Sequence, residues 1–147
     1  MLQQLKQSEA EKLIEMLKRS LTDNVIFPER GKSLDFNVEG ESKHDLFKIH
    51  IYRGKINRLK YNIGALIEKN GTPLLELHIN PGNKHMNPDG TVISCSHWHI
   101  YNEIYGIKIA FPAENIQSDN FVKTTIEFLD KFNVIEKPEI QYQCELL

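Results

Sequence analysis

The stretch YNIGALIEKNGTPLLELHIN, residues 61–80, carries the strongest fold signal in the chain. Its second half alternates apolar and polar residues, which is the period of a strand with one buried face. The apolar positions are Leu75, Leu77 and Ile79, and the alternate positions are Glu76, His78 and Asn80. Asn70-Gly71 stands between the two halves and is the dipeptide most typical of a type I′ turn. The stretch therefore predicts an antiparallel hairpin.

Two segments before this hairpin repeat the alternation. SLDFNVEG, residues 33–40, and DLFKIHIYRG, residues 45–54, place an apolar side chain at every second position. These positions are Leu34, Phe36, Val38, Phe47, Ile49 and Ile51. SHWHIYNEIYGIKIAFP, residues 96–112, predicts two further strands, or one bent strand interrupted near Gly106. Successive strands without intervening helices predict a curved antiparallel meander over residues 33–113.

Amphipathic helices are predicted on both sides of the meander. Residues 1–23 carry an apolar stripe at helical spacing, and Ser8 with Glu11 has the pattern of a capping box. The stripe consists of Leu13, Ile14, Leu17 and Leu21. SDNFVKTTIEFLDKF, residues 118–132, predicts a second helix capped by Ser118. Its apolar face would contain Phe121, Thr125, Phe128 and Leu129. After Pro138, a short final strand is predicted from the alternation of Ile140, Tyr142, Cys144 and Leu146.

The predicted elements form one α+β domain over residues 1–147, because no repeat, linker or low-complexity segment divides the chain. The parts are an N-terminal helix within 1–23, a sheet with a histidine loop at 33–113, and a helix and final strand at 118–147. The 18 basic and 20 acidic residues leave a net charge of −2. This balance disfavours both a dedicated nucleic-acid binder and an acidic nucleic-acid mimic.

The cysteines and the N-terminal residues indicate a compartment. Cys95 and Cys144 form no CxxC pair, and the first residues are too charged for a signal peptide. No apolar run approaches the roughly 20 residues of a membrane-spanning helix. We therefore expect a soluble protein with reduced thiols in the cytoplasm of a host bacterial cell, without contact to a membrane.

The segment HMNPDGTVISCSHWHIY, residues 85–101, holds three of the chain's six histidines. His97 and His99 project from the same face of a strand, because side chains alternate along it. The intervening Asn-Pro-Asp-Gly at 87–90 is a strong turn sequence that would bring His85 back to this pair. Three neutral imidazoles favour a zinc site, which needs a fourth ligand. The candidates are Asp89, Cys95, His78, a water molecule or a side chain of a partner.

The sequence also allows other interpretations of these residues. The histidines could be hydrogen-bonded imidazoles on a polar sheet face, and Cys95 could be a small, partly buried hydrophobic residue. Trp98 alternates with the histidines and is predicted to face the core. Arg53 and Lys55 could contact a partner or a phosphate group, although a solvated strand end explains their charge equally well.

Several of these motifs resemble an uncharacterised bacterial and prophage domain family. They are YRGKIN at 52–57, LLELHINPGNKHMNPDG at 74–90, HWHIY at 97–101, AFP at 110–112 and EFLDKFNV at 127–134. The resemblance covers about residues 45–147 and falls on His85, Asn87, Asp89, His97 and His99. The chain departs from the family pattern where it has His78 in place of Asp, and Ser96 in place of Pro.

The chain is also similar to small prophage proteins that inhibit type II CRISPR effectors, some of which carry a metal. That resemblance implies a stoichiometric inhibitor of a Cas9-type nuclease, acting by protein–protein binding with a structural zinc and without direct nucleic-acid binding. Two alternatives come from other classes: a metal-dependent ribonuclease or hydrolase toxin, and a metal-free interaction module. The sequence leans against an enzyme, because no motif pairs metal ligands with a placed carboxylate.

Overall fold

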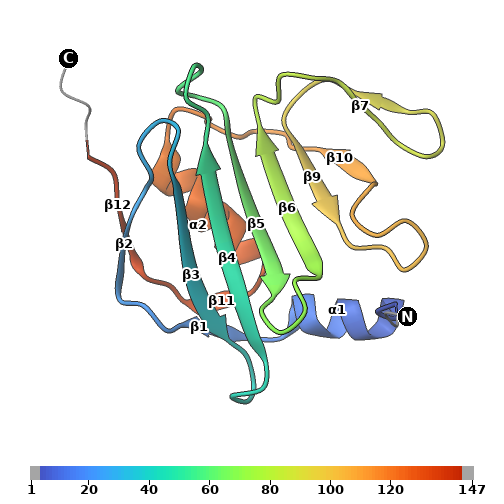
Figure 1. The fold of residues 1–147 in the computed structure, drawn as a ribbon, viewed down its shortest axis with the longest axis vertical. Helices are drawn as coiled ribbons and strands as arrows, with labels where there is room; N and C mark the ends of the chain where they lie inside the picture. Colours follow the sequence, from blue (N-terminus) through green and yellow to red (C-terminus); the bar gives the residue numbers. More distant parts are fainter. Residues whose placement is uncertain (1–3, 144–147) are drawn as a thin grey trace.

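The computed structural model describes residues 4–143, and within them an eight-stranded sheet dominates (Figure 1). Its strands are, in spatial order, β10 (Ala110–Pro112), β9 (His97–Ile100), β6 (Pro73–Ile79), β5 (Tyr61–Ile67), β4 (Leu46–Arg53), β3 (Ser33–Glu39), β1 (Lys18–Ser20) and β11 (Val134–Glu136). Two small sheets accompany it, formed by β2 (Asn24–Ile26) with β12 (Glu139–Gln141) and by β7 (His85–Met86) with β8 (Val92–Ile93). The described helices are α1 (Gln7–Glu15) and α2 (Phe121–Lys131). The α+β class is confirmed.

The strands from β3 to β6 form the predicted antiparallel meander. Each pairs with the next along the chain, and the apolar alternate positions of all four lie on one face, where they are buried except for the partly buried Leu34 and Ile67. Figure 1 shows α2 behind this part of the sheet, so the helix covers the apolar face. Trp98, on β9, lies on the same face and stacks on Phe128 of α2 with ring centroids 6.0 Å apart. The prediction that Trp98 packs against the core is confirmed.

The turn between β5 and β6 differs from the predicted type I′ turn. A type I′ turn requires a positive φ at both central residues, but only Gly71 of the Asn70-Gly71 pair has one, at 75°. The amide of Gly71 donates to the carbonyl of Ile67, and the amide of Ile67 donates to that of Thr72. The connection is therefore a four-residue loop, in which Asn70 caps the amide of Thr72 through its side chain.

The first helix is shorter than predicted. It begins at Gln7 and ends at Glu15, its N-cap is Lys6, and the chain continues as β1 and β2. Leu17 and Leu21, assigned to the apolar stripe, are exposed, whereas Lys18 is buried. The Lys18 ammonium donates to the carbonyls of Ile14 and Met16, which a continuing helix would have used for its own amides. The Lys18 side chain therefore caps the carbonyls at the C-terminal end of α1, and β1 begins at this residue.

The second helix confirms its predicted face and corrects its start. Phe121, Thr125, Phe128 and Leu129 are buried, as expected. The N-cap is Asn120, whose side chain accepts from the amide of Lys123, and not Ser118. The Ser118 carbonyl instead accepts a hydrogen bond from the Tyr61 hydroxyl, which ties the loop before α2 to β5.

Two parallel pairs interrupt the antiparallel pattern. β1 pairs in parallel with β11, and β2 pairs in parallel with β12, so the segments at the two ends of the chain lie side by side. The predicted final strand is present at Glu139–Gln141, while Cys144 and Leu146 lie outside the described residues. Neither α1 nor α2 has the length and apolar character to cross a membrane.

Candidate metal centre

The face of the sheet opposite α2 carries a cluster of imidazoles. In the register of β6 and β9, His78 lies opposite His97 and Glu76 lies opposite His99. Because side chains alternate along a strand, all four project from the face that does not hold Leu77 and Trp98. The register between these two strands therefore adds His78 to the predicted pair of His97 and His99.

The three rings are close enough to share one ion. Ring centroids of His78, His97 and His99 lie 4.6–5.2 Å apart, and one nitrogen from each lies within 4.8 Å of the others. Nitrogen ligands of a tetrahedral zinc lie about 3.3 Å apart. Side-chain rotations that move each nitrogen by about 1 Å would bring the three nitrogens to this spacing. The residues present therefore fit a three-histidine metal site.

His85 reaches the same cluster from the β7–β8 hairpin. Its ring centroid lies 4.8 Å from that of His99 and 5.6 Å from that of His97. The turn at 87–90 forms as predicted, with the Gly90 amide donating to the Asn87 carbonyl. The Nε2 of His85 lies 2.6 Å from the Lys108 carbonyl and donates to it. His85 thus borders the three-histidine set, and the Lys108 carbonyl orients its ring.

Asn87 fixes the hairpin over the cluster, a role that the motif alone did not reveal. Its amide nitrogen donates to the Ala110 carbonyl at 2.9 Å, and its amide oxygen accepts from the Ala110 amide at 2.7 Å. The buried side chain therefore pairs with β10 in the manner of a neighbouring strand. This pair holds the segment that carries His85 against the edge of the sheet.

Backbone carbonyls set the protonation pattern of the two buried rings. His97 Nδ1 donates to the Cys95 carbonyl at 2.9 Å, and His99 Nδ1 donates to the Ile107 carbonyl at 2.7 Å. In a neutral imidazole this leaves Nε2 with a free lone pair. Metal-binding histidines are typically oriented by such a bond from the other ring nitrogen. Among residues 4–143, nothing hydrogen-bonds to the buried Nε2 of His99.

Burial keeps these imidazoles neutral. His97 is 2% and His99 5% exposed. Burial lowers the pKa of His97, and burial together with the neighbouring His78 lowers the pKa of His99 to about 4. A metal binds the unprotonated ring, so both residues are in the binding-competent form at neutral pH. His78 is partly exposed, and its Nε2 donates to the Glu76 carboxylate at 3.0 Å.

The other two candidate ligands lie outside the cluster. Asp89 is exposed and accepts from the Thr91 amide at 2.9 Å, a bond that lowers the pKa of its carboxyl group. Cys95 has an exposed thiol, and its contribution to the site is the carbonyl that orients His97. Within the described residues, the set that could hold a metal consists of His78, His97 and His99.

The two basic residues considered for phosphate or partner contact occupy different places. Arg53 is 1% exposed, donates to the carbonyls of Arg58 and Pro28, and lies 4.5 Å from the ring centroid of Phe121. Its guanidinium therefore packs in the core instead of facing a surface ligand. Lys55 is exposed in the loop after β4. The alternation of Phe47, Ile49 and Ile51 extends to Arg53, a signal for a buried position that the expected surface contact did not take into account.

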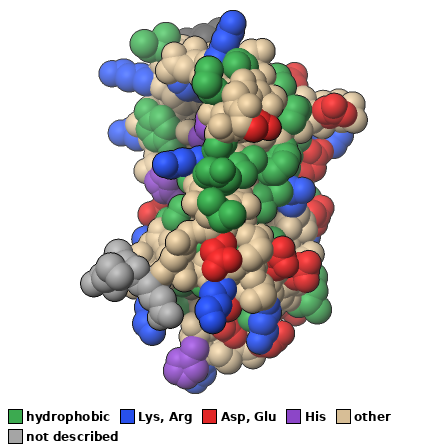
Figure 2. Space-filling model, turned by 90° about the vertical axis from the view of Figure 1, so that its right-hand side faces the viewer, with side chains coloured by type: hydrophobic (Ala, Val, Ile, Leu, Met, Phe, Trp, Pro, Cys, Tyr) green, Lys and Arg blue, Asp and Glu red, His purple; other side chains and the backbone are tan. Residues whose placement is uncertain are grey.

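Exposed hydrophobic side chains gather beside the cluster. Figure 2 views the molecule from the side on which β7, β9 and β10 lie, and hydrophobic side chains cover the middle of this view. The large exposed hydrophobic residues between positions 86 and 111 are Met86, Val92, Ile104, Tyr105 and Phe111. We call these five residues the apolar edge. The carbonyls of Ile107 and Lys108, which orient His99 and His85, belong to the same segment.

Fold and site together define an α+β domain with a histidine cluster on the open face of its sheet. Residues 5–134 match a family of unknown function, DUF6978, and the chain belongs to this family. The match agrees with the expected membership in an uncharacterised domain family. No curated protein and no solved structure matches the chain.

Proposed function

We propose that the protein is a metal-binding domain in which His78, His97 and His99 hold a divalent transition-metal ion, with zinc as the first candidate. The buried Nε2 of His99 is the observation that supports this function. A buried polar atom without a partner costs about 1–3 kcal/mol. A bound metal removes this cost, because it accepts the lone pair that the Ile107 carbonyl has oriented.

The proposed site has three protein ligands and an open fourth position. The sequence predicted a closed structural site, but His85, Asp89 and Cys95 lie outside the group of side chains whose ligand atoms are close together. Three histidines with one open position are the arrangement of zinc sites that bind water or a further ligand. Nickel and copper accept the same donors, so the metal is identified by measurement.

Metal analysis of protein purified without a histidine tag tests this function. We expect about one equivalent of zinc in the wild-type protein after zinc loading and desalting, and less than about 0.2 in His97→Ala/His99→Ala. His44→Ala is the matched control, because it removes an exposed imidazole outside the cluster. Wild-type protein that retains no more metal than the double variant would exclude the proposal.

A second candidate function is inhibition of a Cas9-type nuclease through protein–protein binding. The apolar edge supports a protein partner, since contiguous exposed hydrophobic patches mark interaction sites. Ile104 is its most exposed member, at 78%. The nuclease as partner follows from the sequence resemblance and remains a prediction.

A DNA-cleavage assay with a type II effector and an equimolar amount of this protein tests inhibition. We expect reduced cleavage with the wild-type protein and restored cleavage with Ile104→Asp/Phe111→Asp, in which two exposed apolar side chains become charged. Lys12→Asp is the control, because it changes the net charge by the same two units at an exposed position of α1. Unimpaired cleavage across several type II effectors in the presence of folded protein would remove this candidate.

A further inference from the structure

We propose that a hollow on the open sheet face is a ligand site for a small uncharged carbonyl compound, bound between the metal centre and His50. The hollow has a volume of about 370 Å³ and is formed over β4, β5 and β6. His78 lines it together with His50. The inference rests on the proposed function, because His78 belongs to the metal-binding set.

The sheet register explains the shape of the hollow. His50 lies opposite Gly64, which lies opposite Glu76, and the next row contains Tyr52, Asn62 and His78. A Cβ on Gly64 would meet only the Cγ of Glu76 at 3.6 Å and the Leu75 carbonyl oxygen at 3.9 Å. The centre of the hollow is therefore open because glycine has no side chain. Two interstrand spacings put its walls about 9.5 Å apart.

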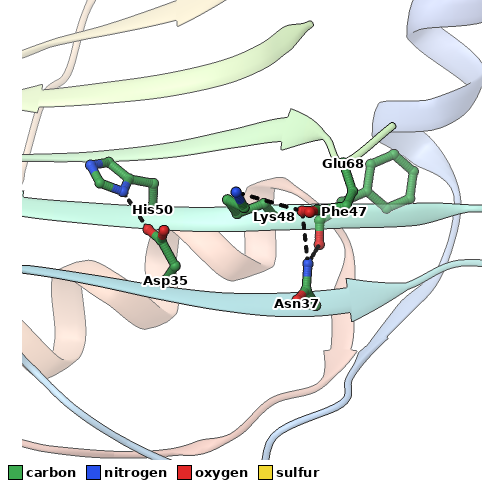
Figure 3. Close-up of polar contacts among 6 residues, drawn as sticks. All are labelled: Asp35, Asn37, Phe47, Lys48, His50 and Glu68. Atoms are coloured by element: carbon green, nitrogen blue, oxygen red, sulfur yellow. Dashed lines mark hydrogen bonds and ion pairs between the residues drawn. The ribbon is translucent and has the colours of Figure 1, made fainter. Parts of the chain in front are cut away.

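His50 gives the far wall a hydrogen-bond acceptor. It lies opposite Asp35 on β3, and its Nδ1 donates to the Asp35 carboxylate (Figure 3). An ionised carboxylate only accepts hydrogen bonds, so Nδ1 carries a proton, and when the ring holds no second proton its Nε2 is an acceptor. Figure 3 shows Nε2 on the side of the ring away from Asp35. A ligand reaches this acceptor with an N–H or O–H group.

The charges of the lining select the ligand class. Lys48, the next cation along β4, turns to Glu68, with 3.9 Å between its Nζ and the carboxylate, and neither residue lines the hollow. Among the lining residues there is one carboxylate, that of Glu76, and no lysine or arginine. This lining does not provide the basic contacts that phosphate groups and nucleic acids require. An uncharged compound does not require basic contacts. Its carbonyl oxygen is a suitable ligand for the open metal position.

The size of the hollow limits the length of the ligand. About 370 Å³ is near the lower end of the range for small-molecule sites, roughly 300–1,000 Å³. A compact molecule can place a carbonyl oxygen at the metal and a donor at His50 across about 9.5 Å. Tyr52 and Asn62 flank such a molecule, and the flat floor at Gly64 suits a planar ring.

Titration of cobalt-loaded protein with 4-hydroxybenzamide tests the site. The uncharged amide carbonyl supplies the metal-binding group and the ring hydroxyl supplies the donor, while the visible spectrum of Co²⁺ reports a change in coordination. We expect Gly64→Ile, which fills the floor, to bind the probe at least about tenfold more weakly than wild type. We expect His50→Leu to weaken binding of this probe about fivefold, the effect of one hydrogen bond, and to leave the binding of benzamide, which lacks the ring hydroxyl, unaffected.

The outcomes separate this inference from the metal function. Co²⁺ affinity should be the same in wild type, Gly64→Ile, His50→Leu and the His44→Ala control. Absence of Co²⁺ binding in the wild type would overturn the metal function itself. Bound Co²⁺ with equal probe affinity in wild type and His50→Leu would overturn the ligand site and leave the metal function standing. The His50→Leu comparison carries the test if Gly64→Ile does not fold.

Discussion

Lys18 and His99 are both almost completely buried polar residues, but their surroundings differ in one respect. Lys18, 1% exposed, donates to the carbonyls of Ile14, Met16 and Phe132 at 2.8–2.9 Å, so its three donors are all used. His99, 5% exposed, has one nitrogen bonded to a carbonyl, and the other has no partner in the described part of the chain. A fully bonded buried group contributes to the stability of the fold, whereas an oriented free lone pair among other imidazoles supports the proposed metal site.

The largest change in stability should come from Lys18, whose three donors all have partners. Lys18→Met leaves three carbonyls without their donor, and we expect the free energy of unfolding to fall by about 4 kcal/mol. Urea denaturation at neutral pH measures this change. Lys12→Met, at an exposed position of α1, is the matched control and should change stability by less than about 0.5 kcal/mol. Equal stability of the two variants would contradict the view that the hydrogen bonds of the buried Lys18 stabilise the fold.

Acidification should destabilise the metal-free protein through His99. The pKa of His99 is lowered to about 4 in the folded state, against 6.5 in the unfolded chain. The unfolded chain therefore binds the proton first, and the free energy of unfolding falls as the pH drops from about 6.5 to about 4, by up to about 3 kcal/mol. Denaturation in EDTA at several pH values should show this loss in wild type and a smaller one in His99→Leu. Parallel pH profiles of the two proteins would argue against a neutral buried His99.

Zinc should stabilise the wild-type protein and leave His99→Leu unaffected. Free zinc at 100 times the dissociation constant adds about 2.7 kcal/mol to the free energy of unfolding. For a domain of this size the melting temperature should rise by about 5–10 °C, and EDTA should reverse the rise. Differential scanning calorimetry of both proteins with and without zinc measures the effect. An identical rise in His99→Leu would place the stabilising metal elsewhere.

Asn87→Ala should produce the smallest of these effects. It removes both hydrogen bonds to Ala110 and leaves a buried amide and a buried carbonyl without partners, at a cost of about 2 kcal/mol. Because the hairpin borders the histidine cluster, zinc affinity should fall as well, by about fivefold. Isothermal titration and urea denaturation measure the two quantities. The exposed Asn24→Ala is the control, and unchanged zinc affinity in Asn87→Ala would separate the hairpin from the metal centre.

The strands were predictable because their signal is local. Alternation from Leu34 to Ile79 determines which side chains face the core, and the structure buries one face of β3 to β6 accordingly. The extent of the first helix was not predictable in this way. Lys18 has the spacing of an exposed helical residue, and its acceptor on Phe132 lies 114 positions along the chain.

The candidate site was partly predictable for the same reason. His97 and His99 share a face by the period of a strand, and the Asn-Pro-Asp-Gly turn correctly indicated that His85 would approach them. The central place of His78 depends on the register between β6 and β9, which the alternation within one strand does not specify. The capping of α2 by Asn120 instead of Ser118 is a local choice between two good capping residues.

The parallel pairing of β1 with β11 has a consequence for synthesis on the ribosome. β1 lies between β3 and a strand that is translated more than a hundred residues later. At about 5–20 residues per second, the nascent chain waits roughly 6–23 s for that neighbour. During this interval the edge of β1 is bare and the Lys18 ammonium lacks one of its carbonyls. The backbone groups along this edge of β1 stay unpaired until β11 has been translated.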